Sequence, residues 1–516
     1  MRRLLCGKVL PLFGALVLVG LSHSAAPALN EFQKLAANDG LANDNFGFSV
    51  GISGDTAILG AWKDDRPGMN GTDAGSAYLF DHNGAGIWSP AGKLVASDSH
   101  AGDSFGSSVA ISGDTAIVGA VLRDNKGGAY IFQDNGAGVW EEIDILSASD
   151  AAAGDEFGYS VAIGGDTAIV GAWTDNLSTG AAYVFRDDGS GAWTETGRLT
   201  ASDGVAGDRF GVSVAISGTT ALVGAHFESN EAGPLTGAVY VFENDGTAWN
   251  EVDKLIASDA SLSNQFGSSI AISGDTAIIG AMGDNTSGVA SGAAYIFQRE
   301  AAGWREVVKL TASDAAENDL FGFSVGIDAT TAVVGAYQDD DAGLTSGSAY
   351  FFTDNGSGNW SQVAKLSASD NAAGDAFGYS VAISGGVGLV GAPLSNSGDT
   401  DAGAGYLFNV PVGLLGDYNS DSRVDAADYV VWRKQFGMAG ANLAADGNGD
   451  SIVNQGDYQL WRQNFGISET SPPPAALLLV PEPSAAALLL VTMFALSLHR
   501  SGAHWQSQAE PVAPAR

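Results

Sequence analysis

The sequence is poor in cysteine and in basic residues. Its 516 residues include one cysteine, Cys6, and 23 lysines and arginines against 59 aspartates and glutamates, which gives a formal net charge of −36. Cys6 lies in the N-terminal leader, so we expect neither disulfides nor thiolate chemistry in the mature protein. The shortage of lysine and arginine argues against a nucleic-acid partner, because contacts to phosphates need these side chains.

Helical periodicity is also missing from most of the chain, whereas glycine is abundant, with 71 residues. Glycine at this level without a collagen period indicates many tight turns, and therefore many short strands. The chain is 45% hydrophobic and contains 11 tryptophans, which argues against general disorder.

The N-terminus has the features of an export signal. Residues 1–28 begin with basic side chains, continue with an apolar run over 9–21 and end in small residues up to Ala28. This order predicts a secretory signal peptide cleaved after Ala28. The alternative is a membrane anchor, for which the apolar run is short.

Seven copies of one pattern occupy residues 29–410. Each copy has a Phe-Gly pair, then a Gly-Ala pair, then Tyr-x-Phe, and the copies lie about 55 residues apart on average. Their segments of four to eight residues, rich in Val, Ile, Ala and aromatics and bounded by Gly, Asp or Asn, are typical of strands joined by hairpins. Four antiparallel strands per copy predict an all-β fold, a seven-bladed β-propeller of four-stranded blades. The Phe-Gly pairs begin at Phe46, Phe105, Phe157, Phe210, Phe266, Phe321 and Phe377.

The two ends of this region indicate how the ring closes. A Lys-Leu pair ends most copies, but Lys34-Leu35 precedes the first Phe-Gly pair and none follows Phe408. We therefore expect residues 29–36 to form the fourth strand of the last blade, with Leu29 at the position that Trp holds elsewhere. Such a closure leaves no exposed edge. The alternative is an open solenoid with unpaired ends.

The paired Phe-Gly and Gly-Ala motifs resemble the FG-GAP repeat of the integrin α-subunit propeller and its bacterial relatives, over residues 29–410. Many FG-GAP units carry a calcium loop of the form DxDxDG between the first two strands. Here that connection is Ser-Gly-Asp-Thr or similar, which is too short to supply six or more oxygen ligands. We therefore do not expect calcium in the propeller.

Acidic residues gather instead in two loops of each copy. One precedes Phe-Gly, as in Asp98–Asp103, and the other follows Gly-Ala, as in Asp339–Asp341. Both are expected on one face of the propeller, which is the natural place for a ligand or cation. For any single residue, however, the interpretation that the aspartate caps a turn is favoured. No catalytic motif appears, and the carboxylates are too numerous for spacing to nominate a catalytic pair.

Two loops near the C-terminus carry the sharpest chemical pattern. Residues 417–428 and 446–457 place acid or amide side chains at loop positions 1, 3, 5, 9 and 12, the spacing of an EF-hand-like calcium loop. Two Ca²⁺ ions are therefore expected; the alternative is a pair of acidic loops without metal. The predicted side-chain ligands are Asp417, Asn419, Asp421, Asp425 and Asp428 in the first loop and Asp446, Asn448, Asp450, Asn454 and Asp457 in the second, and the carbonyls are those of Arg423 and Ile452.

Each loop is followed by a matching segment, YVVWRKQFG or YQLWRQNFG, offset by 29 residues. This duplicated loop–helix unit, within residues 411–470, resembles the type I dockerin domain. The resemblance implies a small α-helical domain that calcium folds and that docks onto a cohesin-like partner. It also implies that loop positions 10 and 11 help to choose that partner; here they are Ala426, Ala427, Gln455 and Gly456.

Residues 471–516 begin with a Pro-rich linker and continue with Val480-Pro-Glu-Pro-Ser484, an apolar stretch over 485–498 and His499-Arg500. This arrangement resembles the PEP-CTERM sorting signal, although some residues follow the basic end. The alternative is an ordinary C-terminal membrane anchor. Both place the protein at or beyond the cell envelope.

Together these features predict an exported, non-catalytic surface or matrix protein. Its propeller is expected to bind protein or glycan, and its dockerin-like module to dock when calcium is bound. One alternative is a component of polysaccharide catabolism, a hydrolase, lyase or accessory subunit, which would need a carboxylate pair that breaks the repeat symmetry in the central channel. Another is a structural protein retained in exopolysaccharide.

Overall fold

Two units make up the chain, Met1–Val410 and Pro411–Arg516, and we describe each by itself. This computed structural model describes residues 28–411 except 66–71, 85, 231–232 and 357, and residues 418, 423–438, 443, 445 and 452–466 of the second unit. The predicted signal peptide apart from Ala28, and the whole predicted sorting segment, lie outside the described residues. Among the helices described, none combines the length and the apolarity needed to cross a membrane.

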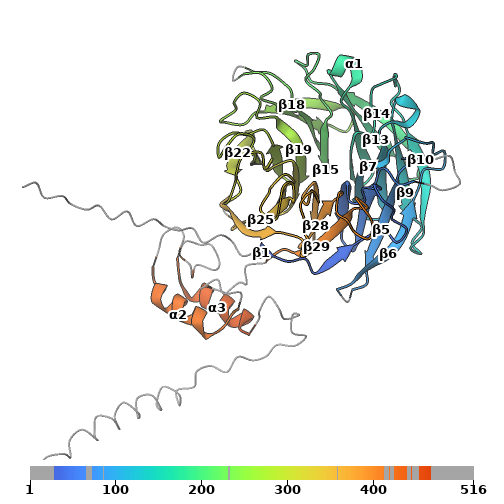
Figure 1. Cartoon of the computed structure of the whole chain (residues 1–516). Helices are drawn as coiled ribbons and strands as arrows, with labels where there is room; N and C mark the ends of the chain where they lie inside the picture. The colour runs from blue at the N-terminus through green and yellow to red at the C-terminus, as the bar shows by residue number, and fades with distance from the viewer. Residues whose placement is uncertain are drawn as a thin grey trace, which may run out of the picture. The chain divides into compact units, whose positions relative to one another are not determined.

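The first unit is a seven-bladed β-propeller of antiparallel sheets arranged around one axis, as the sequence predicts (Figure 1). In blades 1 to 6 the four strands of the repeat pair in sequence order, in blade 7 the outer strand comes from the N-terminal segment, and the first strand of every repeat lines the central channel. The strands of blades 1 to 4 are β3 (Ser49–Ser53), β4 (Thr56–Ala61), β5 (Ser76–His82) and β6 (Trp88–Leu94); β7 (Phe105–Ser112), β8 (Thr115–Ala120), β9 (Gly128–Asp134) and β10 (Trp140–Leu146); β11 (Ser160–Gly164), β12 (Thr167–Ala172), β13 (Ala181–Asp187) and β14 (Trp193–Leu199); β15 (Ser213–Ser217), β16 (Thr220–Ala225), β17 (Ala238–Asn244) and β18 (Trp249–Leu255).

Blades 5 to 7 repeat this plan, and short helical turns interrupt two loops. The strands are β19 (Phe266–Ser273), β20 (Thr276–Ala281), β21 (Ala293–Glu300) and β22 (Gly303–Leu310); β23 (Ser324–Asp328), β24 (Thr331–Ala336), β25 (Ser348–Asp354) and β26 (Trp360–Leu366); β27 (Ser380–Ser384), β28 (Val387–Ala392) and β29 (Ala404–Asn409), joined by β2 (Gln33–Leu35). The helical turns are η1 (Arg123–Asn125) and α1 (Asp175–Ser178).

Phe-Gly and Gly-Ala pairs hold neighbouring blades together. Phe105 is fully buried and packs edge-on against Tyr130 and Phe132 of its own blade, with ring centroids 5.3 and 6.0 Å away. Gly106, at φ +89°, sits so close to blade 1 that a Cβ at Gly60 would overlap its carbonyl oxygen. The motif is therefore an inter-blade contact that admits no side chain at either glycine.

Blade 7 is completed by the N-terminal segment, as predicted. β2 pairs antiparallel with β29, and Lys34 lies opposite Tyr406. The prediction was wrong about the first residues of this segment, because β1 (Ala28–Leu29) pairs in parallel with β26 of blade 6. Leu29 therefore does not take the place of Trp in blade 7. The outer edge of β26 has unpaired backbone groups, and β1 satisfies some of them.

A second inter-blade contact lies at the outer strands. In blade 2, the Glu142 carboxylate accepts hydrogen bonds from the backbone N–H of Ser97 (2.8 Å) and from its hydroxyl (2.5 Å), after the last strand of blade 1. At the ring closure, Glu31 makes the same contact with Ser369. The other pairs are Ser149 with Glu195, Ser202 with Glu251, Ser258 with Glu306 and Ser313 with Gln362.

The second unit contains α2 (Ala426–Gln435) and α3 (Gln455–Asn464), each of which begins at position 10 of a predicted calcium loop. The two halves exchange matching contacts: Trp432 Nε1 donates to the Asn454 carbonyl over 2.9 Å, and Trp461 Nε1 donates to the Asp425 carbonyl over 2.8 Å. The described part of its core comprises Tyr418, Val424, Trp432, Ala445, Val453 and Trp461.

Candidate functional site

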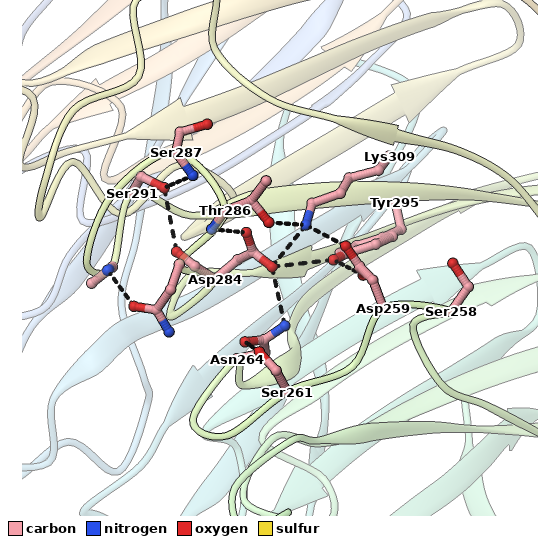
Figure 2. Close-up of polar contacts among 12 residues, drawn as sticks. Ser258, Asp259, Ser261, Asn264, Asp284, Thr286, Ser287, Ser291, Tyr295 and Lys309 are labelled. Atoms are coloured by element: carbon pink, nitrogen blue, oxygen red, sulfur yellow. Dashed lines mark hydrogen bonds and ion pairs between the residues drawn. The ribbon is translucent and has the colours of Figure 1, made fainter. Parts of the chain in front are cut away.

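Both acidic loops of a blade meet in one cluster of polar side chains, which Figure 2 shows in blade 5. The Lys309 ammonium, on β22, lies 2.7 Å from a carboxylate oxygen of Asp259 and 2.9 Å from one of Asp284. Asp259 belongs to the loop before Phe-Gly and Asp284 to the loop after Gly-Ala. The Tyr295 hydroxyl donates to Asp259 over 2.7 Å. One ammonium thus joins the two loops, as the shared face predicted.

Protonation within the cluster follows from burial and pairing. Burial by itself would raise the pKa of Asp259, but the hydrogen bonds from Lys309 and Tyr295 and the charge of the ammonium outweigh it and lower this pKa. Burial raises the pKa of the Tyr295 phenol, and the Asp259 carboxylate adds to that shift. The phenol therefore stays a neutral donor, while the carboxylate stays charged.

The cluster recurs in every blade, with two variations. In blade 2, Ile145 pairs with Tyr130, so the cation comes instead from Arg123 in the loop after Gly-Ala. In blade 7, Ser395 replaces the second carboxylate and contacts Tyr406 over 3.3 Å. The groups of aspartate, tyrosine and cation are Asp39, Tyr78 and Lys93; Asp98, Tyr130 and Arg123; Asp150, Tyr183 and Arg198; Asp203, Tyr240 and Lys254; Asp259, Tyr295 and Lys309; Asp314, Tyr350 and Lys365; Asp370, Tyr406 and Lys34.

Blade 6 has the densest cluster of acids. Carboxylate oxygens of Asp314, Asp339 and Asp341 all lie within 4.8 Å of one another. The Lys365 ammonium lies among them, 2.8 Å from Asp314 and 3.0 Å from Asp339. Burial would lower the pKa of Lys365, but its hydrogen bonds to these acids and their charges outweigh burial and raise it. The chain's own ammonium therefore stands where an acidic cluster would otherwise hold a cation.

A further aspartate in most loops before Phe-Gly caps a turn. Asp103 accepts a hydrogen bond from the His100 backbone N–H over 2.6 Å, and Asp44 accepts one from Leu41 over 2.6 Å. Burial raises the pKa of Asp44 to about 6. These aspartates shape the loops, which is the turn-capping alternative drawn from the sequence. The same contact is made by Asp155, Asp208, Asp319 and Asp375.

Sequence reasoning missed a second group, at the end of the innermost strands where these loops meet. The residues after Phe-Gly and after Gly-Ala share this end, because Ser49 of β3 pairs with Gly60 of β4. Many of them are aromatic. We call the following side chains the aromatic mouth: Phe48, Trp62, Tyr159, Trp173, Phe227, Phe323, Tyr337 and Tyr379.

Blades 6, 7 and 1 form one side of the aromatic mouth. Tyr379 lies between Phe48 and Phe323, with ring centroids 4.9 and 5.0 Å away. Burial raises the pKa of Tyr379, and the phenols of Tyr159 and Tyr337 contribute to the shift. Tyr159 belongs to blade 3, on the other side of the mouth. Blades 2 and 5 carry Ser107 and Ser268 at the corresponding positions, so the aromatic side chains break the repeat symmetry.

Blades 3 and 4 form the other side, around a cation. The Arg209 guanidinium carbon lies 4.4 Å from the Trp173 ring centroid and 3.9 Å from that of Phe227. His226 is 5% exposed, and its ring centroid lies 4.2 Å from that of Phe227. Burial lowers the pKa of His226 to about 3, and the charge of Arg209 acts in the same direction. His226 is therefore neutral at ordinary pH.

The side chains that line the central channel are apolar. Its cavity of about 250 Å³ is lined by three residues from the first strand of each blade, all of them Val, Ile, Ala or Gly, such as Val50, Gly51 and Ile52. A carboxylate pair in the channel, which the catalytic alternative requires, does not occur among these lining residues.

A known protein family matches the same seven repeats. The family described as FG-GAP repeat matches seven segments, residues 29–80, 88–132, 140–185, 193–242, 249–297, 304–352 and 360–408. The chain belongs to the FG-GAP repeat family. FG-GAP propellers are typical of extracellular or surface proteins that bind partners, and this coarse class applies to the chain.

No curated protein matches this FG-GAP chain. Among solved structures, the crystal structure of Saccharomyces cerevisiae Sqt1 is similar over 75% of this chain and 100% of that one, with 10% sequence identity and a TM-score of 0.41.

Beyond the FG-GAP repeats, the described members of the predicted calcium loops begin the two helices. Asp425 caps α2 by accepting from the Ala427 N–H over 2.6 Å, and Asn454 caps α3 by accepting from the Gly456 N–H over 2.6 Å. Asp428 and Asp457 are fully buried, and each accepts the backbone N–H of the cap residue three positions earlier. These side chains offer only oxygen, which fits the preference of Ca²⁺.

The remaining predicted ligands divide between described and undescribed positions. Arg423 and Ile452 are exposed and lie directly before the two buried valines that precede the caps. The residues predicted to choose a partner, Ala426, Ala427, Gln455 and Gly456, form the first turns of α2 and α3. Outside the described residues lie Asp417, Asn419, Asp421, Asp446, Asn448 and Asp450.

Proposed function

We propose that this FG-GAP protein is an exported, non-catalytic binding protein of the cell surface or extracellular matrix. Its propeller presents the face of the acidic loops and the aromatic mouth to a protein or a glycan. Its C-terminal unit is a dockerin-like module that binds two Ca²⁺ ions and docks to a cohesin-like or other surface protein. The segment 471–516 is a PEP-CTERM-like sorting signal that retains the protein at the envelope.

One observation carries the binding role of the propeller, the broken symmetry of the aromatic mouth. The ion clusters recur from blade to blade and hold the loops together. A structural role is therefore enough to explain why their residues are present. The aromatic side chains are confined to some blades and frame the end of the channel, with Tyr159 42% exposed. Symmetry that is kept for folding and lost at one exposed place is typical of a ligand site.

The docking role is supported by the duplicated loops and by their helix caps. Asp428 and Asp457 are held in equivalent buried positions, and both halves use the same capping pattern. Calcium would bring the acidic side chains of each loop around one centre and thereby fix the helix that follows. The exposed first turns of α2 and α3, with Ala426 and Ala427 in one and Gln455 in the other, would contact the partner.

Calcium binding by the full mature chain tests the module. We expect two ions per chain by isothermal titration calorimetry, and one ion after either Asp417→Ala or Asp446→Ala, because each residue opens one predicted loop. Asp399→Ala, in an exposed propeller loop, is the control and should keep both ions. Two ions bound by both loop variants would contradict the assignment.

The docking partner is then sought in the native envelope. The full chain, immobilised with Ca²⁺, should retain one partner that is released by chelation and that the double variant Asp417→Ala with Asp446→Ala does not retain. Retention that is indifferent to calcium and to these substitutions would show that the module does not dock.

A further inference from the structure

Arg209 differs from the other arginines in the described part of the propeller. Five of them, Arg123, Arg186, Arg198, Arg299 and Arg305, form ion pairs with carboxylates. Within the described part of the chain, Arg209 makes no ion pair, and its guanidinium donates no hydrogen bond. In a protein of net charge −36, an arginine left without a carboxylate is unusual.

The surroundings of Arg209 fix the plane of its guanidinium. Trp173 and Phe227 lie over it at 4.4 and 3.9 Å, close enough for cation–π contact. Trp173 is itself held, since its Nε1 donates to the Glu156 carboxylate over 2.7 Å. The Glu156 carboxylate therefore accepts a hydrogen bond from the Trp173 indole, although the negative charge of Glu156 also acts on the Arg209 guanidinium. Because the two rings hold the guanidinium, its N–H groups are already oriented. They donate no hydrogen bond to any of the described residues.

Two buried polar atoms without hydrogen-bond partners also lie around the aromatic mouth. His226 is 5% exposed, and its buried Nδ1 has no hydrogen-bond partner; the same is true of the buried Nε1 of Trp62. Leaving a buried polar atom unpaired costs about 1–3 kcal/mol. An unpaired buried polar atom calls for an explanation, and one explanation is a ligand that completes its hydrogen bond. They lie on opposite sides of the mouth, in blades 4 and 1.

We propose that the aromatic mouth binds a saccharide that bears an isolated carboxylate, a uronic acid within an otherwise neutral glycan. The carboxylate pairs with the fork of Arg209, whose planar geometry matches it. Phe48, Tyr159 and Tyr379 pack against the C–H faces of neighbouring sugar rings. His226 Nδ1 and Trp62 Nε1 are buried in the free protein, so they would bond to sugar hydroxyls only after the side chains that cover them move on binding.

Charge and ring geometry favour this ligand over other acids. The acidic loops around the mouth repel a dense polyanion, whereas one carboxylate facing the unpaired Arg209 is attracted at short range. Nucleic acid is disfavoured for the same reason. The mouth offers flat aromatic rings, some with a single N–H donor at the edge. A sugar ring matches them, because its C–H faces are apolar and its hydroxyl groups lie around its edge. This inference rests on the proposed binding role of the propeller and names its ligand class.

The test uses the full chain and an array of oligosaccharides, each present as the uronic acid and as its carboxyl-reduced counterpart, followed by calorimetry. We expect binding to at least one uronate and at least about ten-fold weaker binding to the reduced form. Arg209→Gln should weaken uronate binding by a similar factor. Arg209→Lys, which keeps the charge but lacks the fork, should weaken it less. The control Arg186→Gln removes a cation that pairs with Asp166 and should leave binding unchanged.

Circular dichroism and melting temperature show whether each variant is folded, and Arg209→Lys keeps the test decisive if Arg209→Gln unfolds. Failure of every uronate to bind the wild-type chain would overturn the proposal. So would equal binding of acidic and reduced sugars, or a preference for acidic peptides that depends on Arg209; both would leave the propeller's general binding role standing. Absence of any ligand for the propeller would overturn that role as well.

Discussion

At the residue scale, the acidic loops of the propeller are held by the chain's own cations. Lys365 lies among three carboxylates in blade 6, and Lys34 contacts one carboxylate, Asp370, in blade 7. A lysine ammonium brings positive charge without coordination geometry, so it keeps two loops together at any calcium concentration. These ion pairs are partly buried, which makes loss of one partner costly.

We expect Lys365→Met to lower the free energy of unfolding of the propeller by roughly 3 kcal/mol, because Asp339, which is 3% exposed, would lose its cation. Millimolar Ca²⁺ should restore part of this loss, since the carboxylates of Asp314, Asp339 and Asp341 lie within 4.8 Å of one another. Denaturant unfolding followed by tryptophan fluorescence, with and without Ca²⁺, measures both effects.

Lys34→Met is the matched control for this experiment. In blade 7 the second acid is replaced by Ser395, so the variant should lose stability without gaining a response to Ca²⁺. An equal response of the two variants to Ca²⁺, or unchanged stability of Lys365→Met, would contradict the role given to the ammonium.

At the scale of elements, the ring is closed by a short strand together with side-chain contacts of the N-terminal segment, one of which is made by Glu31. β2 has only three residues, which is little for a strand that must join the two ends of the propeller. The Glu31 carboxylate adds a bond to the Ser369 N–H at 3.0 Å and one to its hydroxyl at 2.5 Å. This contact repeats the one that joins other neighbouring blades.

Glu31→Ala should therefore lower the melting temperature of the propeller by a few degrees, corresponding to about 1 kcal/mol for a partly exposed charged hydrogen bond. Glu31→Gln should be tolerated much better, because Gln362 makes the equivalent contact with Ser313 in blade 6. Differential scanning calorimetry compares the two variants. Equal melting temperatures for Glu31→Ala and the wild type would show that the strand alone closes the ring.

At the scale of the whole molecule, the proposed calcium sites and the β structure belong to different units. We expect a chelator to unfold the C-terminal unit, because in the proposed module the helices α2 and α3 depend on calcium bound in the loops before them. The strand signal of the propeller should remain, since lysine and arginine side chains hold its acidic loops together. Far-UV circular dichroism of the full chain, before and after chelation and after restoring Ca²⁺, measures this. Loss of both signals together would show that calcium also holds the propeller.

Much of the propeller could be predicted from the sequence, because the strands of a blade can be recognised within each repeat. Gly60 and Gly106 mark a backbone contact that no other residue permits, and Trp140 and Trp193 begin the outer strands of their blades. The closing strand could also be predicted, because the last repeat lacks a fourth strand of its own and the N-terminal segment carries the matching Lys-Leu pair. The parallel pairing of β1 with β26 was not predictable, because it uses an edge that no repeated residue marks.

Local pattern, then, determined the number of blades, their strands and the position of the two acidic loops, because hairpin pairing acts between residues close in sequence and the same glycine motif recurs in every repeat. Only the tertiary structure decided which distant side chains meet. Arg209 lies between Trp173 of blade 3 and Phe227 of blade 4 because neighbouring blades pack side by side. The repeat marks the positions of most of these aromatic side chains, after Phe-Gly or Gly-Ala, but only the three-dimensional structure shows which of them contact one another around the channel.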